Sequence, residues 1–148
     1  MNIIDFNHVS IPVSNLDNSI KFYRKYLDME LFNNSVRAKS FSEQITGIKG
    51  VSLKIAYLRT IGLKLELIEY THRTKNIFSK LNQNKLGHIC FNVSGIEEFY
   101  GKNKSEIKFI IGPTLIPSGP NMGGLMTYFF DIDNNKIELI EPPNSSFI

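Results

Sequence analysis

The chain repeats itself, and this repeat constrains its fold more than any other feature. Residues 7–16 read NHVSIPVSNL and residues 87–96 read GHICFNVSGI, which aligns His8 with His88. A second word follows in the same order, because residues 64–70 read KLELIEY and residues 136–142 read KIELIEP. This second match aligns Glu66 with Glu138. Two matches in the same order and at similar separations indicate two copies of one structural unit.

Each copy is predicted to fold as a βαβββ unit. In the first copy, residues 6–13 alternate as a strand does, and Ser14 and Asn15 can cap a following helix. That helix is marked by apolar residues at spacings of three and four, namely Leu16, Ile20, Tyr23 and Leu27. Three strands are then expected near residues 29–38, 51–58 and 62–70. In the second copy, strands are expected near 86–93, 106–111, 124–131 and 136–141, with a helix starting near Gly95.

The two copies fit one domain of 148 residues with an α+β fold. We expect module 1 at about 5–70 and module 2 at about 86–143, joined by a polar, basic linker at about 71–85. His72 is then expected in the linker, exposed to solvent. The residues DIDNN, 131–135, predict a tight hairpin turn, because Asp and Asn tolerate left-handed backbone conformations.

Two histidines and two glutamates are predicted to point away from the helix-covered faces of the two sheets. Successive side chains of a strand point to opposite faces of the sheet. His8, His88, Glu66 and Glu138 are therefore expected on the face opposite to the one that carries the apolar side chains of their strands. A single His or Glu in such a strand is usually structural or solvated. Two equivalent His–Glu pairs in two copies favour a metal site instead, provided that the sheets curve so that the four converge. Two imidazoles and two carboxylates suit one divalent ion such as zinc, nickel, cobalt, manganese or iron.

Composition bears on the classes of function and on the cellular location that the chain can have. The net charge of +3 is too small to indicate nucleic-acid binding, although it is compatible with an anionic small-molecule substrate. A single cysteine, Cys90, excludes an intramolecular disulfide framework. The sequence shows no apolar run long enough to span a membrane and no secretory signal at its start, so we expect a cytoplasmic protein that does not bind membranes.

The chain resembles the vicinal oxygen chelate superfamily, which includes glyoxalase I, methylmalonyl-CoA epimerase, extradiol dioxygenases, fosfomycin-resistance enzymes and bleomycin-resistance proteins. Four motifs carry the resemblance, from about Phe6 to Pro143: HVSIPVSNLDNSIKFYRKYL, KLELIEY, GHICFNV and YFFDIDNNKIELIEPP. It implies paired βαβββ units forming an open, barrel-like cup with a metal inside. The family's metal positions fall on His8, Glu66, His88 and Glu138. Two turns depart from the family pattern, since Asp28 replaces the Gly of Leu-Gly-Met and Asn134 replaces the Gly of Asp-Pro-Asp-Gly.

Within the family, four protein ligands favour an isomerase, epimerase or lyase. Such an enzyme binds a carbonyl oxygen at the metal, and proton transfer then proceeds through an enediolate. Glu138 and Glu66 are the expected catalytic carboxylates, and a pseudo-twofold site suits two-base epimerisation. The insert SFSEQITGIKG and the polar linker favour an epimerase acting on acyl-CoA thioesters or keto-sugars over glyoxalase I itself. An extradiol-type dioxygenase and a non-catalytic, ligand-sequestering protein remain the alternatives.

The sequence also predicts the positions of several residues outside the proposed metal site. Cys90 shares the face of His88 and can line the pocket, while Glu43 is expected in a loop. Glu69 and Glu141 have the opposite parity and are assigned to strand ends. The Gly-rich segment 117–124 is expected to border the cup, either as a mobile cover or as a passive connection. We expect a homodimer, because open cups leave sheet edges and apolar rims to cover.

Overall fold

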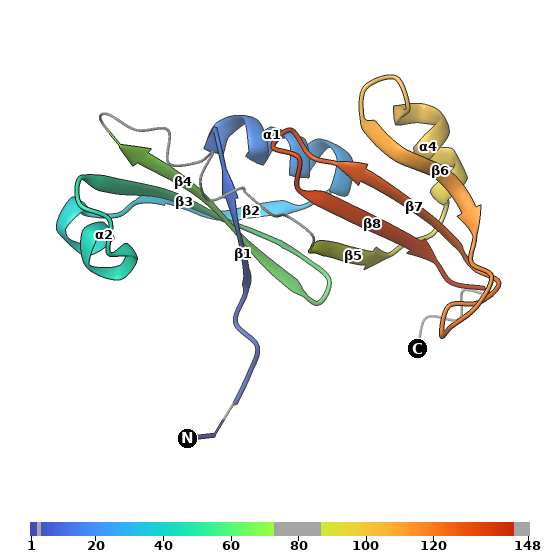
Figure 1. The fold of residues 1–148 in the computed structure, drawn as a ribbon, viewed down its shortest axis with the longest axis horizontal. Helices are drawn as coiled ribbons and strands as arrows, with labels where there is room; N and C mark the ends of the chain where they lie inside the picture. Colours follow the sequence, from blue (N-terminus) through green and yellow to red (C-terminus); the bar gives the residue numbers. More distant parts are fainter. Residues whose placement is uncertain (3, 73–86, 144–148) are drawn as a thin grey trace. The chain divides into compact units, whose positions relative to one another are not determined.

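The computed structural model describes residues 1–2, 4–72 and 87–143 and divides the chain into two compact units, Met1–Asn84 and Lys85–Ile148. The first unit contains β1 (Val9–Val13), α1 (Leu16–Leu27), β2 (Glu30–Val36), α2 (Lys39–Thr46), β3 (Val51–Thr60) and β4 (Leu63–His72). The second contains β5 (His88–Asn92), α4 (Ile96–Asn103), β6 (Lys108–Leu115), β7 (Leu125–Phe130) and β8 (Lys136–Glu141). Figure 1 shows both units with these labels. The α+β class and the predicted order of strands and first helix in each copy are confirmed.

The two sheets have the same topology. The first has the strand order β1-β4-β3-β2 and the second has β5-β8-β7-β6. In each sheet the first pair is parallel, β1 with β4 and β5 with β8, and the other pairs are antiparallel. The two repeated motifs therefore lie side by side in each unit. In the first unit β1, which starts directly after His8, pairs with β4, which holds Glu66. In the second unit β5, which starts at His88, pairs with β8, which holds Glu138.

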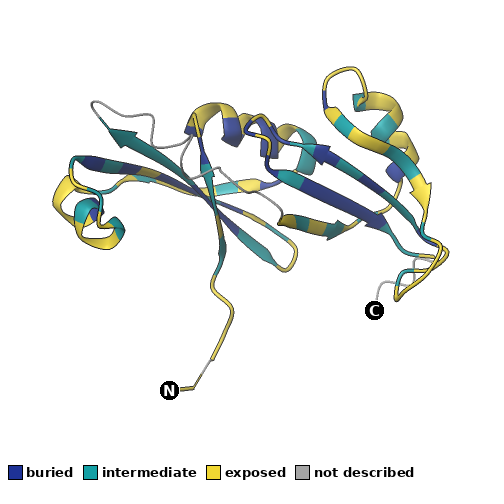
Figure 2. Ribbon diagram, viewed as in Figure 1, coloured by how far each residue is buried: buried dark blue, intermediate teal, exposed yellow. Residues whose placement is uncertain are grey.

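Helix α1 covers one face of the first sheet. Asn15 caps it, since its Oδ1 accepts from the backbone N–H of Asn18 at 2.9 Å. The helix buries its apolar stripe against the sheet, and Figure 2 shows buried residues both in α1 and along β3. The residues of this core are Leu16, Ile20, Tyr23, Ala56, Leu58, Leu65 and Leu67. Leu65 and Leu67 thus lie on the helix side, as their parity predicted.

The two departures from the family's turn motifs both adopt left-handed backbone conformations. Asp28 follows α1 with φ of 48°, and Asn134 lies in the β7–β8 turn with φ of 60°. They are the only residues other than Gly with positive φ in the described part of the chain. Asp and Asn accept this conformation better than other residues with a Cβ, which explains why they can replace Gly here.

Helix α2 was not expected. No helix is predicted in or beside the insert SFSEQITGIKG, yet Lys39–Thr46 forms a helix that ends at Gly47 with φ of 68°. It packs against β3, next to a buried cluster of Val51, Leu53 and Ile55 with Ile48 against it. Glu43 is therefore a helical residue, and its Oε1 accepts from the N–H of Gly50 at 2.6 Å. The prediction that Glu43 lies in a loop is wrong.

The boundary of the predicted linker also needs correction. Thr71 and His72 are the last residues of β4, where they pair with Ser52 and Val51 of β3. His72 is partly buried, and its Nε2 lies 2.9 Å from the carbonyl oxygen of Lys49. It is therefore not an exposed linker residue, whereas the rest of the predicted linker lies outside the described residues. Within the described residues, no helix is long and apolar enough to span a membrane.

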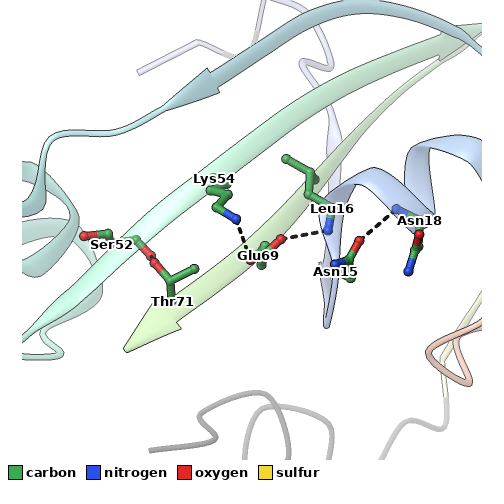
Figure 3. Close-up of polar contacts among 7 residues, drawn as sticks. All are labelled: Asn15, Leu16, Asn18, Ser52, Lys54, Glu69 and Thr71. Carbon is green, nitrogen blue, oxygen red and sulfur yellow. Dashed lines mark hydrogen bonds and ion pairs between the residues drawn. The ribbon is translucent and has the colours of Figure 1, made fainter. Parts of the chain in front are cut away.

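The second glutamate of each repeated word anchors a helix. Glu69 Oε2 accepts from the backbone N–H of Leu16, the first residue of α1, at 2.8 Å, and its Oε1 accepts from Lys54 Nζ at 2.9 Å (Figure 3). Glu141 accepts from the N–H groups of Gly95 and Ile96 at 2.9 and 3.0 Å. Each carboxylate satisfies N–H groups that the first helical turn leaves without an internal partner, and its charge is favourable at that end of the helix. The words KLELIEY and KIELIEP therefore carry one glutamate for each face of the sheet.

Glu141→Gln is expected to destabilise the fold by about 1 kcal/mol at neutral pH, the usual effect of losing an N-terminal cap. Its backbone hydrogen bonds lower the pKa of Glu141 below 4.5, so the stabilisation is present above that pH and is lost as the pH falls through the folded-state pKa. Urea unfolding at pH 7 and at successively lower pH measures this difference. Glu97→Gln is the control, because Glu97 lies in the first turn of the same helix and makes no such backbone contact. Equal destabilisation by both substitutions would contradict the assignment.

Candidate functional site

In the first unit, a histidine, a glutamate and a tyrosine meet on the face opposite α1. His8 immediately precedes β1, and its Nε2 lies 3.3 Å from Glu66 Oε2. Tyr57 of β3 donates its hydroxyl to Glu66 Oε1. The rings of His8 and Tyr57 also contact edge to face, with their centroids 5.6 Å apart. The structure thus brings His8 and Glu66 together, as the sequence predicted.

The second unit repeats this arrangement. His88 Nε2 lies 2.8 Å from Glu138 Oε2, and the hydroxyl of Tyr128 hydrogen-bonds with the same carboxylate. The rings of His88 and Tyr128 again meet edge to face, at 5.6 Å. Cys90, which pairs with Glu138 across the β5–β8 ladder, also hydrogen-bonds with this carboxylate. The expectation that Cys90 shares the face of His88 agrees with this contact.

The strand register explains why each tyrosine reaches its glutamate. Tyr57 stands directly opposite Glu66 in the β3–β4 hairpin, and Tyr128 stands opposite Glu138 in the β7–β8 hairpin. Directly opposed side chains of an antiparallel pair lie on the same face and contact each other. Sequence reasoning did not identify either tyrosine. The signal was present, because each tyrosine and its glutamate lie at equal distances from the turn that joins their strands.

The two carboxylates are buried, and their surroundings keep the neighbouring hydroxyls protonated. Glu66 is 7% exposed and Glu138 is 8% exposed. Burial, and then the hydrogen bond to and the charge of Glu66, raise the pKa of Tyr57. The same causes, with Glu138 as the carboxylate, raise the pKa of Tyr128 to about 12. Burial and Glu138 also raise the pKa of Cys90 to about 12, so both tyrosines and the thiol act as donors at neutral pH.

The donor atoms of each pair suit a metal ion. In the first unit Tyr57 binds Oε1 of Glu66, and Oε2 faces the Nε2 of His8; in the second unit Oε2 of Glu138 faces the Nε2 of His88. In His8 the other ring nitrogen, Nδ1, lies 2.7 Å from Asn7 Oδ1, a contact that orients the ring. Nε2 and Oε2 face each other at 3.3 Å in the first unit and at 2.8 Å in the second. Two donors that bind one ion at about 2.0–2.2 Å lie about 3 Å apart, which the observed separations match.

Neither unit gathers a complete set of metal ligands within its described residues. Among residues 1–2, 4–72 and 87–143, no three His, Cys, Asp or Glu side chains are gathered as a metal ion requires. The contribution of each unit is one imidazole and one carboxylate, held by a parallel strand pair.

The other candidates have local roles. The segment 117–124 forms the connection between β6 and β7, and backbone hydrogen bonds between Ile116 and both Gly123 and Gly124 close its base. A side chain at Gly124 would meet the carbonyl oxygen of Glu141 at 2.5 Å, which explains the glycine there. Glu69, Glu141 and Glu43 bind backbone N–H groups, so their charges serve the fold.

Comparison with known proteins identifies relatives of this fold. A family model described as the glyoxalase/bleomycin resistance protein/dioxygenase superfamily matches residues 5–139. The structure is similar to a glyoxalase family protein from Bacillus cereus, with a TM-score of 0.75, 18% identity and 96% of each chain covered. It is similar to the fosfomycin resistance protein FosX from Listeria monocytogenes, with a TM-score of 0.66, 17% identity and 97% of each chain covered.

A glyoxalase family protein from Enterococcus faecalis has 25% identity and a TM-score of 0.63, and the match covers 95% of this chain and all of that one. The structural similarities, at this level of identity, concern the fold. The family model covers most of the chain, and its span contains the His–Glu–Tyr sets of both units. The chain belongs to the glyoxalase/bleomycin resistance protein/dioxygenase superfamily.

Proposed function

We propose that the protein is a metal-dependent isomerase or epimerase, or a related lyase, and that one divalent ion is held by His8, Glu66, His88 and Glu138. The substrate is a small molecule with a carbonyl group next to an acidic C–H. The expected ions are zinc, nickel, cobalt, manganese and iron, which such nitrogen and oxygen ligands suit. In this proposal, Glu138 and Glu66 carry the proton.

One observation carries the proposal: two buried carboxylates occupy equivalent places in two units, each with an imidazole nitrogen facing its Oε2 and a tyrosine hydroxyl hydrogen-bonded to the carboxylate. A charged carboxylate in a buried position is costly unless it is paired or binds a cation. Because both units bury a carboxylate at this free-energy cost, we infer a function that uses the carboxylates of both units. Structures of the related fold give independent support, because FosX from Listeria monocytogenes has been crystallised with Mn(II).

The chain's own groups divide the work. The two imidazoles would hold the ion, and Asn7 orients the ring of His8. Tyr57 and Tyr128 fix one oxygen of each carboxylate and keep its orientation. The other oxygen of each carboxylate is left to bind the ion or to accept a proton from the substrate. When bound, a divalent ion acts as a Lewis acid that polarises the substrate carbonyl and acidifies the neighbouring C–H.

The proton transfer predicts isotope exchange. Incubation in deuterium oxide with a panel of acyl-CoA thioesters, headed by methylmalonyl-CoA, and of keto-sugars is expected to introduce deuterium at the carbon next to the carbonyl of the true substrate. Mass spectrometry of the recovered compound measures the uptake, and protein treated with a chelator is the control. Oxygen consumption coupled to turnover without deuterium uptake would contradict the proposal and favour the dioxygenase alternative.

We also expect a homodimer. Each sheet has edge strands, β1 and β2 in the first unit and β5 and β6 in the second, whose outer backbone groups can pair with another chain. Exposed apolar side chains, including Ile110 and Ile111 of β6, lie along one of these edges. Light scattering is expected to give twice the mass of the chain across a range of concentrations. A monomer at high concentration would count against this prediction.

A further inference from the structure

A cavity lies beside the second half of α1, where the chain turns into β2. Its volume is about 620 Å³, within the range of small-molecule sites. Its described lining comes from one continuous segment, residues 21–31, which holds the end of α1, the turn after it and the start of β2. Helix α1 covers the face of the first sheet opposite to the one that carries His8 and Glu66, so the cavity is separate from the candidate metal site.

The lining of this cavity is positively charged. Its cations lie three and four residues apart, and therefore on one side of α1: Lys21, Arg24 and Lys25. Of its two carboxylates, that of Glu30 accepts two hydrogen bonds from Arg59 at 2.9 Å. Three cations therefore line the cavity against one carboxylate, that of Asp28, for which the described residues provide no ion pair.

Two of these cations lack a charge partner. Among the described residues, neither Lys21 nor Arg24 lies within ion-pair distance of a carboxylate. Arg24 and Lys25 belong to the last turn of α1, where the helix dipole favours a cation. Lys21 lies before that turn, so the helix end does not explain it. A negatively charged ligand would satisfy Lys21 and Arg24 together.

The repeat shows that this cluster is specific to the first unit. Counting from the first residue of each helix, Gly101 and Ser105 occupy the positions of Lys21 and Lys25 in the second unit. The βαβββ unit therefore does not require cations at these two positions. Their presence beside α1 calls for a role that the second unit does not share.

Two apolar residues complete the lining. Met29 follows the αL residue at the end of α1 and is only 2% exposed, and Leu31 of β2 is partly exposed. They give a ligand apolar surface close to the cations. A small molecule that combines a charged group with an organic part suits such a cavity better than a free inorganic ion.

We propose that this cavity binds a small organic phosphate, with its phosphate group at Lys21 and Arg24 and its organic part against Leu31. A guanidinium recognises a phosphate through two parallel hydrogen bonds, and a lysine adds a point charge. A phosphate monoester carries a charge of about −1.5 to −2 at neutral pH, which matches two unpaired cations better than the single charge of a carboxylate does. The site goes beyond the proposed function and does not depend on it.

The test is a titration of chelator-treated protein, so that phosphate does not bind through a metal ion. Inorganic phosphate, phenyl phosphate and acetate are added separately at constant ionic strength, which removes general screening as a cause. In nuclear magnetic resonance spectra, the side-chain N–H signal of Arg24 and the backbone signals of residues 21–31 are expected to shift and saturate with the two phosphates. Phenyl phosphate is expected to bind roughly 10-fold more tightly than inorganic phosphate, because its ring buries apolar area. Acetate is expected to bind at least roughly 10-fold more weakly than inorganic phosphate.

Substitutions locate the site. Arg24→Gln is expected to weaken phenyl phosphate binding roughly 10- to 100-fold and Lys21→Gln roughly 10-fold, while Arg24→Lys restores only part of the affinity. Lys104→Gln is the matched control, because Lys104 occupies the position of Arg24 at the end of α4 and should not affect binding. Circular dichroism checks that each variant is folded.

Three results would overturn the inference. The first is the lack of a saturable shift at residues 21–31 with either phosphate. The second is equal affinity for phenyl phosphate in the wild type, Arg24→Gln and Lys21→Gln. The third is loss of bound metal in Arg24→Gln before chelation, measured by elemental analysis, because it would show that the cavity and the metal site are not separate.

Discussion

Replacing Glu138 with Gln is expected to lower turnover by roughly 10²–10⁴-fold, the contribution of a positioned general base. The amide keeps an oxygen for the ion and can still accept the hydrogen bond from Tyr128, so much of the metal affinity should remain. It cannot take up the substrate proton, because the amide is not basic. The measurement is the rate of deuterium incorporation into the substrate, together with the metal content of the same preparation.

Glu66→Gln shows how the two carboxylates share the work. If Glu66 serves mainly as a ligand, its loss has a smaller effect on turnover; if two bases act on opposite faces, the two losses are similar. Glu141→Gln is the matched control, since Glu141 lies on the same strand as Glu138 but on its opposite face. Full activity in the Glu66→Gln, Glu138→Gln double variant would remove both carboxylates from the chemistry.

The strands were predictable because their signals are local. The repeat and the alternation of apolar residues located each of the eight strands that the described residues form, and β8 was predicted with its observed limits, residues 136–141. Parity also placed Glu66 and Glu138 on one face and Glu69 and Glu141 on the other. The partners of the last two could not be predicted in this way, because the N–H groups they bind belong to helices distant in the sequence.

Helix α2 was missed because little in its sequence specifies a helix. It has eight residues, and Ala38 before it provides no side-chain cap. Isolated helices of this length are unstable in water and depend on tertiary packing. Here the packing comes from β3 and its buried cluster, which the sequence of the insert alone does not show.

The tyrosines were missed for a different reason. Tyr57 and Tyr128 look like ordinary strand residues, since aromatic residues are common in strands. Their role depends on the register of the hairpins, and register follows from the turn that joins the strands. Applying that rule to both hairpins would have placed a hydroxyl opposite each predicted carboxylate.

Loss of either site histidine is expected to remove the metal. The purified protein should hold about one divalent ion per chain, and His8→Ala or His88→Ala should weaken its binding by more than the roughly 10- to 100-fold that loss of an outer-shell contact costs. Each substitution removes one of only two imidazole donors and leaves a buried carboxylate, Glu66 or Glu138, without its facing nitrogen. Elemental analysis and competition with a chromogenic chelator measure the content and the affinity.

The third histidine of the chain provides the control. His72 lies at the end of β4, where its ring contacts the backbone of Lys49, and His72→Ala should retain the ion. Equal loss in all three variants would indicate a general defect in folding instead of ligand removal. Two ions per chain, each lost with only one of His8 and His88, would show that the units bind metal separately. One ion lost with either histidine is the result that a shared site requires, because neither unit has three ligands within its described residues.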